Sequence, residues 1–368
     1  MNRQEPATKA SAGDAKRVPV MKGGKITYVP RDQVDLELPA FEDAFSPLGN
    51  LVPLKSMVKG QRVAMASRML TQALPLVGAE APLVQGAVPG SGGATSFEEE
   101  YGPHMGAVRA ERAGRVVSVG DGVVRVRYDD GSTDDIELYE HFPFNRKTYI
   151  HQRPTVHPGE QFKAGQLLVT SNYTDATGAT ALGINARVAY LPYKGYNFED
   201  ALVISEGMAQ RMSSEHMYQH EVEADARTKL GKKAYVSLFS QKYEKPVLDR
   251  MDENGVIKVG EEVEFGQPLI LAARERDRAQ NKVHKQRQAG FNDASVVWKH
   301  HDKGIVTDVV RGRKGPVVLV KSISAMQIGD KMSGRYGDKG VIAAIVPDAK
   351  MPHGADGKPY EVLLNPLG

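Results

Sequence analysis

The sequence predicts a β-rich α/β fold, and three observations support this class. The 368 residues include 37 glycines and 21 prolines, which interrupt helices and favour turns. Only 7% of the residues are aromatic, which favours many short strands over a few long helices. Short runs of β-branched residues, several of them alternating with polar ones, lie between the glycines. The composition, 41% hydrophobic and 25% charged, is that of a globular protein of roughly two to three domains and excludes disorder throughout.

The charge of the chain is nearly balanced. The net charge of +3 does not by itself indicate a nucleic-acid partner. Residues 1–33 hold seven basic and three acidic residues, and we expect a basic flexible arm there, or one ordered only against a partner. The absence of cysteine excludes disulfides and thiolate zinc sites, so no zinc is expected. No apolar run reaches the roughly 18 residues of a membrane span, and no secretion signal opens the chain, so we expect a cytoplasmic protein without a membrane partner.

The first predicted elements are a helix and a hairpin. Leu, Met and Val recur at helical spacing between Arg62 and Leu74, and Pro75 is expected to end this helix. Residues 78–104 have the composition of a loop. Residues 115–131 then predict two strands joined around Gly120-Asp121-Gly122, a typical hairpin sequence.

A second β-rich stretch, from about Thr148 to Tyr190, contains one half of an internal repeat. VHPGEQFKAGQLLVTS, at 156–171, resembles IKVGEEVEFGQPLILA, at 257–272. In both copies the Gly-Glu and Gly-Gln pairs begin six residues apart. Glycines so placed suit the positive φ of tight turns, as in a hammerhead or barrel-sandwich module.

The C-terminal third begins with a charged run and returns to strands. Residues 273–288 hold six basic and two acidic residues, which fits a solvated helix face or an exposed flap. The pair His300-His301 has no further ligand at convincing spacing, so no metal role is expected for it. From Gly304 to Gly368, apolar strand-like segments alternate with glycine-rich turns.

Two segments carry residues suited to chemistry. In LPYKGYNFEDALVISE, a glycine turn between aromatics precedes the adjacent acids Glu199 and Asp200. These acids could cap a helix, or lie near a Mg²⁺ ion or a phosphate. In IGDKMSGRYGDKGVI, four glycines alternate with Lys331, Arg335 and Lys339. Glycine lets backbone N–H groups approach an anion, and lysines eight residues apart can converge on phosphates, although a basic surface loop stays an alternative.

Together the two segments resemble the β subunit of multisubunit DNA-directed RNA polymerases. The segments are NARVAYLPYKGYNFEDALVISE and GDKMSGRYGDKGVIAAIVPDAKMPHGADGKPYEVLLNPLG. The resemblance is continuous from about residue 35 and includes NLVPLKSMVKGQRVAMASRMLTQALPLV, RAGRVVSVGDGVVRVRY and YIHQRPTVHPGEQFKAGQLL. It covers roughly nine-tenths of this chain but only the second half of a full cellular β subunit.

The resemblance implies a fold and a division into regions. The expected architecture is a double-psi β-barrel with inserted barrel-sandwich hybrid and flap-like modules. The implied regions are a basic flexible arm (1–33), a helix with the first part of the barrel (34–110), a hybrid-binding or barrel-sandwich region (111–180), a barrel segment with the acidic motif (181–213), a reduced flap or wall (214–310) and a barrel segment with the glycine-lysine motif (311–368).

The resemblance also implies roles for named residues. Lys331 and Lys339 match the two lysines that hold the RNA 3′ end and the phosphates of the incoming nucleotide. Glu199 and Asp200 match an acidic pair beside the second Mg²⁺ ion. Two further positions match a triphosphate-binding arginine and a glutamine near the RNA: Arg62 and Gln72. No family role is carried onto Arg335, which lies between the lysines and could contact the same phosphates.

The implied partners follow from what this sequence lacks. The primary magnesium triad of these enzymes lies in the β′ subunit, in a NADFDGD loop absent here, so this chain is expected to be inactive alone. Asp129-Asp130 and Asp134-Asp135 fit hairpin turns instead. The expected partners are a β′-like chain, an N-terminal β fragment, further polymerase subunits, DNA template, RNA transcript and nucleoside triphosphates. The sequence fits one piece of a naturally split bacteriophage subunit, or a truncated form.

Two other functions stay open at this point. One is a non-catalytic, polymerase-like protein that binds nucleic acid or regulates a polymerase. The other, suggested by the repeated Gly-Glu and Gly-Gln turns, is a biotinyl or lipoyl carrier module. The carrier alternative is the weaker one, because the sequence has no carrier-type lysine signature.

Overall fold

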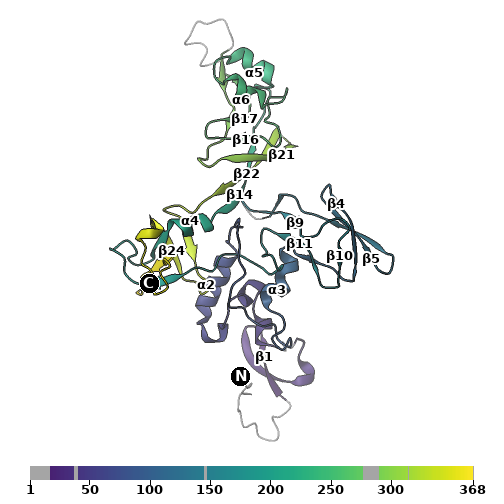
Figure 1. Cartoon of the computed structure of the whole chain (residues 1–368), viewed down its shortest axis with the longest axis vertical. Coiled ribbons are helices and arrows are strands. Elements are labelled where there is room, and N and C mark those ends of the chain that lie inside the picture. The colour runs from purple at the N-terminus through teal and green to yellow at the C-terminus, as the bar shows by residue number, and fades with distance from the viewer. Residues whose placement is uncertain (1–16, 37–39, 145–146, 277–289, 314, 368) are drawn as a thin grey trace. The chain divides into compact units, whose positions relative to one another are not determined.

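A computed structural model describes residues 17–36, 40–144, 147–276, 290–313 and 315–367, and the chain divides into units 1–46 and 47–368 (Figure 1). In the first unit, β1 (Arg17–Lys22) and β2 (Lys25–Pro30) form an antiparallel hairpin. Gly23 and Gly24 lie at its turn with φ values of 58° and 76°, the left-handed conformations that such a turn requires. Residues 17–30 of the expected basic arm therefore form a hairpin, and residues 1–16 lie outside the described residues.

The helices of the second unit are short. They are α1 (Pro47–Asn50), α2 (Gly60–Leu70), α3 (Phe97–Tyr101), α4 (Glu206–Arg211), α5 (Lys232–Leu238) and α6 (Lys245–Asp249). Helix α2 confirms the predicted helix but ends at Leu70 rather than Leu74. The backbone then turns, and the Thr71 hydroxyl donates to the Arg68 carbonyl at 2.6 Å. Among the described residues, no helix is both long and apolar enough to cross a membrane.

We define the first module as residues 108–171, which form the predicted hairpin and the first copy of the repeat. One sheet has the strand order β10-β4-β5-β6 and another β3-β11-β9. Val116, Val124 and Phe162 are buried in the core of this module. The strands are β3 (Val108–Arg109), β4 (Gly114–Gly120), β5 (Val123–Tyr128), β6 (Thr133–Glu137), β7 (Phe142–Pro143), β8 (Tyr149–Ile150), β9 (Gln152–Pro154), β10 (Gln161–Phe162) and β11 (Leu167–Ser171).

We define the second module as residues 214–324, which contain the second copy. Its largest sheet has the order β14-β22-β21-β16, and Trp298 and Leu269 are buried in its core. The predicted boundary between 310 and 311 falls inside the β21–β22 pair and is wrong, because the two strands hydrogen-bond along their length. The strands are β14 (Ser214–Glu221), β15 (Thr228–Leu230), β16 (Glu262–Val263), β17 (Pro268–Ile270), β18 (Ala272–Glu275), β19 (Phe291–Asp293), β20 (Val296–Val297), β21 (Gly304–Arg311) and β22 (Pro316–Ser324).

The prediction for residues 273–288 is only partly within the described residues. Residues up to Glu275 continue strand β18, which pairs with β15 and β19. Residues 277–289, which hold most of the predicted charged run, lie outside the described residues.

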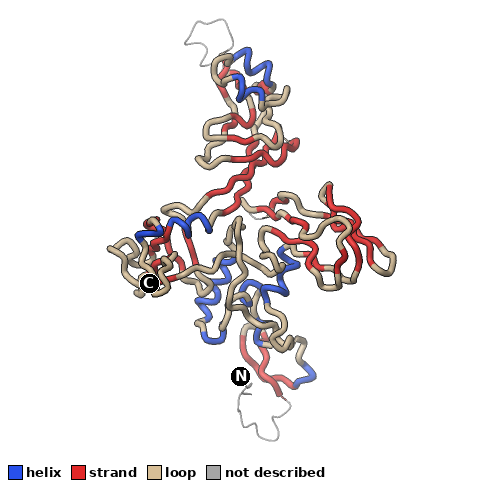
Figure 2. The backbone as a smooth tube through the Cα atoms, in the orientation of Figure 1, coloured by secondary structure: helices blue, strands red, loops and turns tan. Residues whose placement is uncertain are grey.

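A mixed five-stranded sheet joins the two predicted barrel segments. Its order is β12-β25-β13-β24-β23, with bounds Val188–Tyr190, Val362–Leu364, Ala201–Ser205, Lys339–Val346 and Lys331–Ser333. Leu202 and Ile204 pack in a core on one face, and Val203 packs with Leu363 on the other. Side chains therefore cover both faces of the sheet, and Figure 2 shows strands in red.

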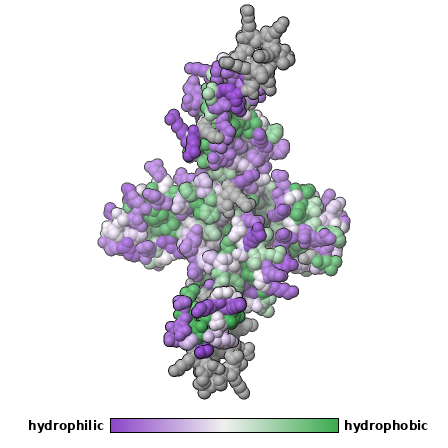
Figure 3. Space-filling model, turned by 180° about the vertical axis from the view of Figure 1, so that it is seen from behind, coloured by the Kyte–Doolittle hydropathy of each residue, from purple (hydrophilic) through white to green (hydrophobic). Residues whose placement is uncertain are grey.

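Large apolar side chains are nevertheless common on the surface. On the face drawn in Figure 3, hydrophobic and hydrophilic residues are interspersed. Tyr190 and Phe198, which precede the acidic pair in the sequence, expose 72% and 67% of their surface. Exposed aromatic rings near a charged site are typical of surfaces that contact a partner.

Candidate functional site

The two predicted lysines lie on one face of a hairpin. Strands β23 and β24 pair antiparallel, with Lys331 opposite Val341 and Ser333 opposite Lys339. Lys331 and Ser333 point to the same face because side chains alternate along a strand, and Lys339 shares that face as the partner of Ser333. The two lysines thus occupy diagonal cross-strand positions, whose Cα atoms are about 7–8 Å apart. Both side chains are exposed, so two positive charges stand side by side toward solvent.

The acidic pair meets the same hairpin. Strand β13, which follows Asp200, runs parallel to β24, and the Val341 amide donates to the Asp200 carbonyl at 2.9 Å. A Cβ atom at Gly340 would lie 2.5 Å from that carbonyl oxygen, so only glycine allows the approach. The segments carrying Lys339 and Asp200, far apart in sequence, are therefore adjacent.

The loop before the acidic pair is held from within. The side chain of Asn197, 1% exposed, accepts from the Tyr193 amide at 2.8 Å and donates to the Leu191 carbonyl at 2.8 Å. Glu199 has a φ of 54°, an uncommon conformation for a residue with a Cβ atom. This conformation reverses the chain just before β13 and leaves Glu199 and Asp200 exposed.

Helix α2 brings Arg62 to the turn between the two lysines. The Arg62 guanidinium donates to the Gly337 carbonyl at 3.2 Å. A Cβ atom at Gly337 would come within 2.9 Å of the Arg62 carbonyl oxygen, and φ at Gly337 is 76°. The first turn of α2 thus packs directly on the glycine-rich turn, and Arg62, still exposed, joins the cationic group.

Two other predicted residues have different surroundings. Gln72 lies in the turn after α2, at the opposite end of the helix from Arg62 and about 15 Å along it, given a rise of 1.5 Å per residue. Arg335 donates to the Val84 carbonyl at 2.6 Å and lies 3.8 Å from a carboxylate oxygen of Glu98. Burial lowers the pKa of Arg335, and the Glu98 carboxylate opposes that shift. The Arg335 guanidinium therefore has protein partners, and phosphate contacts by Gln72 and Arg335 stay predictions.

A network of ion pairs ties together the segments around the five-stranded sheet. Arg211 of α4 bonds Glu80 at 2.8 Å and also contacts Glu361. Arg187 forms a two-bond pair with Asp356, at 2.6 and 2.9 Å, which holds the pKa of Asp356 down to about 2. The Arg211 pairs join α4 to Glu80 and to the segment before β25, and the Arg187 pair joins the segment before β12 to the turn around Asp356.

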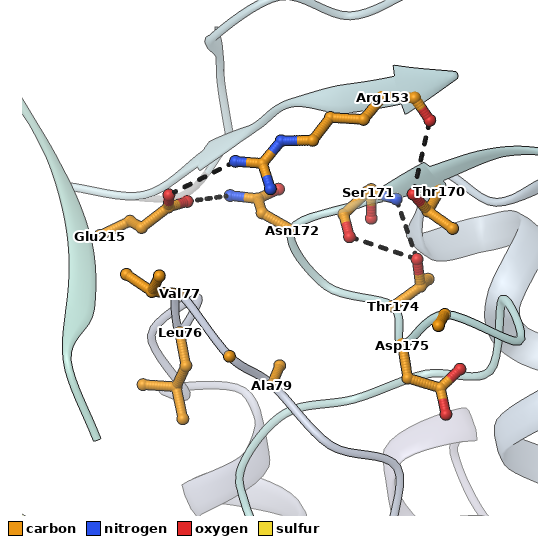
Figure 4. A pocket seen from close by; sticks show the side chains of 12 residues that line it. Leu76, Val77, Ala79, Arg153, Thr170, Ser171, Asn172, Thr174, Asp175 and Glu215 are labelled. Atoms are coloured by element: carbon orange, nitrogen blue, oxygen red, sulfur yellow. Dashed lines mark hydrogen bonds and ion pairs between the residues drawn. The ribbon is translucent and has the colours of Figure 1, made fainter. Parts of the chain in front are cut away.

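Sequence analysis missed a buried polar cluster around Glu215 (Figure 4). The Glu215 carboxylate, 2% exposed, accepts from Asn172 at 3.1 Å and lies 3.1 Å from the Lys321 ammonium. Arg153 lies 3.9 Å away, beside a cavity of about 150 Å³. Burial works to raise the pKa of Glu215, but Lys321 and the hydrogen bonds hold it below its ordinary value. An isolated Glu at the start of a strand gives no sequence signal for such a cluster.

Glu199 and Asp200 are the carboxylates predicted to lie beside a metal ion, and Asp330 and Asp338 stand next to the two lysines in the sequence. Within the described ranges, no group of three or more His, Asp or Glu side chains is placed to hold a metal ion. Glu199 and Asp200 therefore fit only an ion that keeps several water ligands, as Mg²⁺ does when one or two carboxylates bind it.

Comparison with known proteins assigns the family. The family model described as RNA polymerase Rpb2, domain 6, matches residues 118–368. This chain belongs to the β-type RNA polymerase subunits. It is 33% identical over 378 residues to the DNA-directed RNA polymerase subunit beta of Thermus thermophilus, covering 96% of this chain and 33% of that protein. It is 32% identical over 370 residues to that of Rubrobacter xylanophilus, with 94% and 31% covered, and 31% identical over 381 residues to that of Bifidobacterium longum, with 96% and 30% covered.

The comparisons establish two further points about this chain. The chain spans about a third of the length of the curated relatives it matches. The carrier-module alternative loses its support, because both copies of the repeat lie inside residues 118–368, which match a polymerase family.

Proposed function

We propose that this β-type chain supplies nucleotide- and RNA-binding residues to the active centre of a multisubunit DNA-directed RNA polymerase. The supporting observation is the meeting of the β23–β24 hairpin, the start of α2 and the acidic pair at one place. Three exposed cations and two exposed carboxylates gather there from segments separated by up to 277 residues, from Arg62 to Lys339.

In this proposal each group has a distinct task. Lys331 and Lys339 neutralise and position the phosphates at the RNA 3′ end and on the incoming nucleotide, and Arg62 contacts the triphosphate. These cations position the reactants without reading sequence. Glu199 and Asp200 hold a second Mg²⁺ through its water ligands. Bound Mg²⁺ supplies activation of the attacking hydroxyl and stabilisation of the leaving pyrophosphate.

The proposal also includes the partner chains, the type of barrel and the origin of this chain. A β′-like partner carrying NADFDGD supplies the primary metal ligands, with an N-terminal β-like chain completing the subunit. The mixed parallel and antiparallel pairing of the five-stranded sheet supports a double-psi barrel. We also propose that this chain is one part of a divided bacteriophage subunit. Sequencing the neighbouring reading frames tests this, because they should encode the remaining β and β′ pieces.

The test is reconstitution with the partner chains followed by template-directed RNA synthesis. Lys339→Ala is expected to slow elongation at limiting nucleotide by about 100-fold, the scale of losing one preorganised contact to developing charge. Lys358→Ala removes another exposed lysine, from the turn before β25, and should leave the rate unchanged. Normal elongation by Lys339→Ala would contradict the assignment of this lysine.

The non-catalytic alternative predicts a different result. A regulatory relative would bind polymerase or nucleic acid, and the assembled complex would make RNA equally well when Lys331, Lys339 and Arg62 are all replaced by Ala. An inactive triple variant in a complex of normal composition would support the active-centre role.

A further inference from the structure

Near the candidate site, Glu98 has a buried carboxylate with little compensation from hydrogen bonds. Glu98 lies in α3 and is 1% exposed. Among the described residues, neither of its carboxylate oxygens has a hydrogen-bond partner. Burial raises the pKa of Glu98, and the nearby Arg335 opposes this shift. A buried carboxylate without hydrogen bonds is costly, so its retention needs a reason beyond packing.

Two cations act on the Glu98 carboxylate, Lys55 and Arg335, and Arg335 comes from the turn between the two lysines. Nη1 of Arg335 lies 3.8 Å from Oε1 of Glu98 and donates to the Val84 carbonyl at 2.6 Å. Arg335 lies between the end of β23 at Ser333 and the start of β24 at Lys339. The ion pair between Glu98 and Arg335 thus acts on the turn between β23 and β24, and this turn sets the spacing of the two lysines.

Helix α3 is a fixed support for this contact. Ser96 and Glu99 form a reciprocal capping box at its start. The Glu98 carbonyl accepts from the Thr180 amide at 2.7 Å, which joins α3 to the segment after the first module. The neighbouring Phe97 is buried, with the Lys55 ammonium 5.1 Å from its ring centroid.

We propose that Glu98 is a positioning residue that, through Arg335, holds the β23–β24 turn so that Lys331 and Lys339 share one orientation. Glu98 is too deeply buried to touch nucleotide or RNA, so it acts only through Arg335. The turn is then held at two points, by Arg62 on the Gly337 carbonyl and by Glu98 on Arg335. The kinetic part of this inference rests on the proposed function, but the structural part does not.

The structural part is tested on the full chain alone by hydrogen exchange. In Glu98→Gln the side chain keeps its volume but loses its charge, and amide exchange over residues 334–338 should become about tenfold faster. Glu100→Gln changes an exposed carboxylate of the same helix and should not alter exchange there. Glu98→Asp, which keeps the charge, should restore part of the protection. Unchanged exchange in Glu98→Gln would overturn the inference whatever the chain does in transcription.

The kinetic part is tested in the reconstituted complex. Glu98→Gln should lower the elongation rate by about 10- to 100-fold, the scale seen when a catalytic group is displaced without being removed. Glu98→Gln combined with Arg335→Met should cost less than the sum of the two single changes, because both remove one interaction. If Glu98→Gln speeds exchange but leaves elongation normal, the positioning role is overturned. If the complex with the unsubstituted chain makes no RNA, the proposed function is contradicted instead.

Discussion

The two modules of this chain use one hydrogen-bonding scheme with different chain orders. In the first module the hairpin β4–β5 precedes the Gly-Glu and Gly-Gln turns, whereas in the second the turns precede the hairpin β21–β22. The Gly159 amide nevertheless donates to the Val116 carbonyl at 2.8 Å, as the Gly260 amide does to that of Val306. Both hairpins carry a register shift at the same place, after Val116 and after Val306. The scheme is therefore independent of the order in which its strands occur.

The second glycine of each copy makes an equivalent pair of bonds. The Gly165 amide donates to the Ala110 carbonyl at 2.7 Å, and the Gly266 amide donates to that of Trp298 at 2.8 Å. The residue after each glycine accepts in return, from the amides of Ala110 and Trp298, at 2.8 and 2.9 Å. Ala110 and Trp298 therefore occupy equivalent positions, although their side chains differ greatly in volume.

The difference in volume is offset at a second position. Phe162 of β10 and Val263 of β16 are both buried and pair with equivalent glycines, Gly114 and Gly304. A Cβ atom at Gly114 would lie 3.0 Å from the Phe162 ring, and one at Gly304 would lie 3.1 Å from the Trp298 ring. An aromatic ring covers the glycine in both modules, but it comes from β10 in the first module and from the residue after β20 in the second. The two modules thus fill the space over this glycine with different residues, and the smaller Val263 offsets only part of the extra volume of Trp298.

The largest expected effect comes from removing the ring of the second module. Trp298 is fully buried and contacts the rings of Tyr218 and His300, at centroid distances of 5.3 and 4.7 Å. Trp298→Ala should lower the free energy of unfolding by about 3–5 kcal/mol, the usual cost of such a cavity. Hydrogen exchange of β21 and β22 under native conditions is the measurement, with exchange of β4 and β5 as the internal reference.

The same experiment tests whether the two positions compensate. Adding Val263→Phe to Trp298→Ala should recover part of the lost stability, because it rebuilds the Phe-and-Ala arrangement of the first module. Val263→Phe alone should destabilise by about 1–3 kcal/mol through overpacking. Strictly additive losses in the double variant would show that the two positions are not coupled.

A smaller effect is expected from the equivalent glycines. A Cβ atom at Gly114 would overlap the backbone carbonyl of Arg127, whereas one at Gly304 would first meet a methyl group of Val320, at 2.5 Å. Because a side chain can move more easily than a backbone, Gly114→Ala should cost more than Gly304→Ala, within about 1–3 kcal/mol for each. Denaturant unfolding followed by module-specific exchange measures both.

Gly120→Ala is the control for the two glycine substitutions, since a Cβ atom at Gly120 would meet nothing within 4 Å. Equal losses at all three positions would mean that the close approach of the strands is not what requires glycine at 114 and 304.

How much of the fold could be predicted from the sequence depends on how far apart in the chain the interacting residues lie. The hairpin at 114–128, helix α2 and the repeated turns follow from local patterns, and all are present. The equivalence of Gly114 and Gly304 was missed, although both begin a G-x-V-x-x-V pattern, because a permuted order hides it from a comparison that runs along the chain. The boundary error at 310 has a related cause: β22 pairs with β14, about a hundred residues earlier, and local composition does not show it.

The candidate site shows the same division. Residue types and glycine spacing indicated which segments carry the charges, and the structure brings Lys331, Lys339, Arg62 and the acidic pair together. The partner of Arg335 could not be predicted, because Glu98 lies in a segment of loop-like composition and only its burial shows that it faces a cation. The same holds for Glu215, whose partners Asn172 and Lys321 lie far apart in the sequence.

The smallest expected effect is a pH dependence of the stability of the first module, which contains His151. Burial, the neighbouring His141 and the nearby cations lower the pKa of His151 to about 4, and its ring stacks on that of His141 at 4.3 Å. The folded state therefore binds this proton less readily than the unfolded chain, in which the histidine pKa is about 6.5. The stabilisation is complete above pH 6.5 and is lost as the pH falls from 6.5 to 4, by about 1–2 kcal/mol once partial exposure is allowed for.

His151→Asn should flatten part of the stability profile between pH 6.5 and 4, measured by denaturant unfolding at constant ionic strength. The second module has half-buried histidines of its own, His216 and His220, whose pKa values are also lowered by partial burial. Residual pH dependence in His151→Asn should therefore appear in the exchange of β14, which carries both of these histidines, and not in that of β9. An unchanged profile at β9 in this variant would mean that His141, rather than His151, takes up the proton there, because the two stacked rings titrate as a pair.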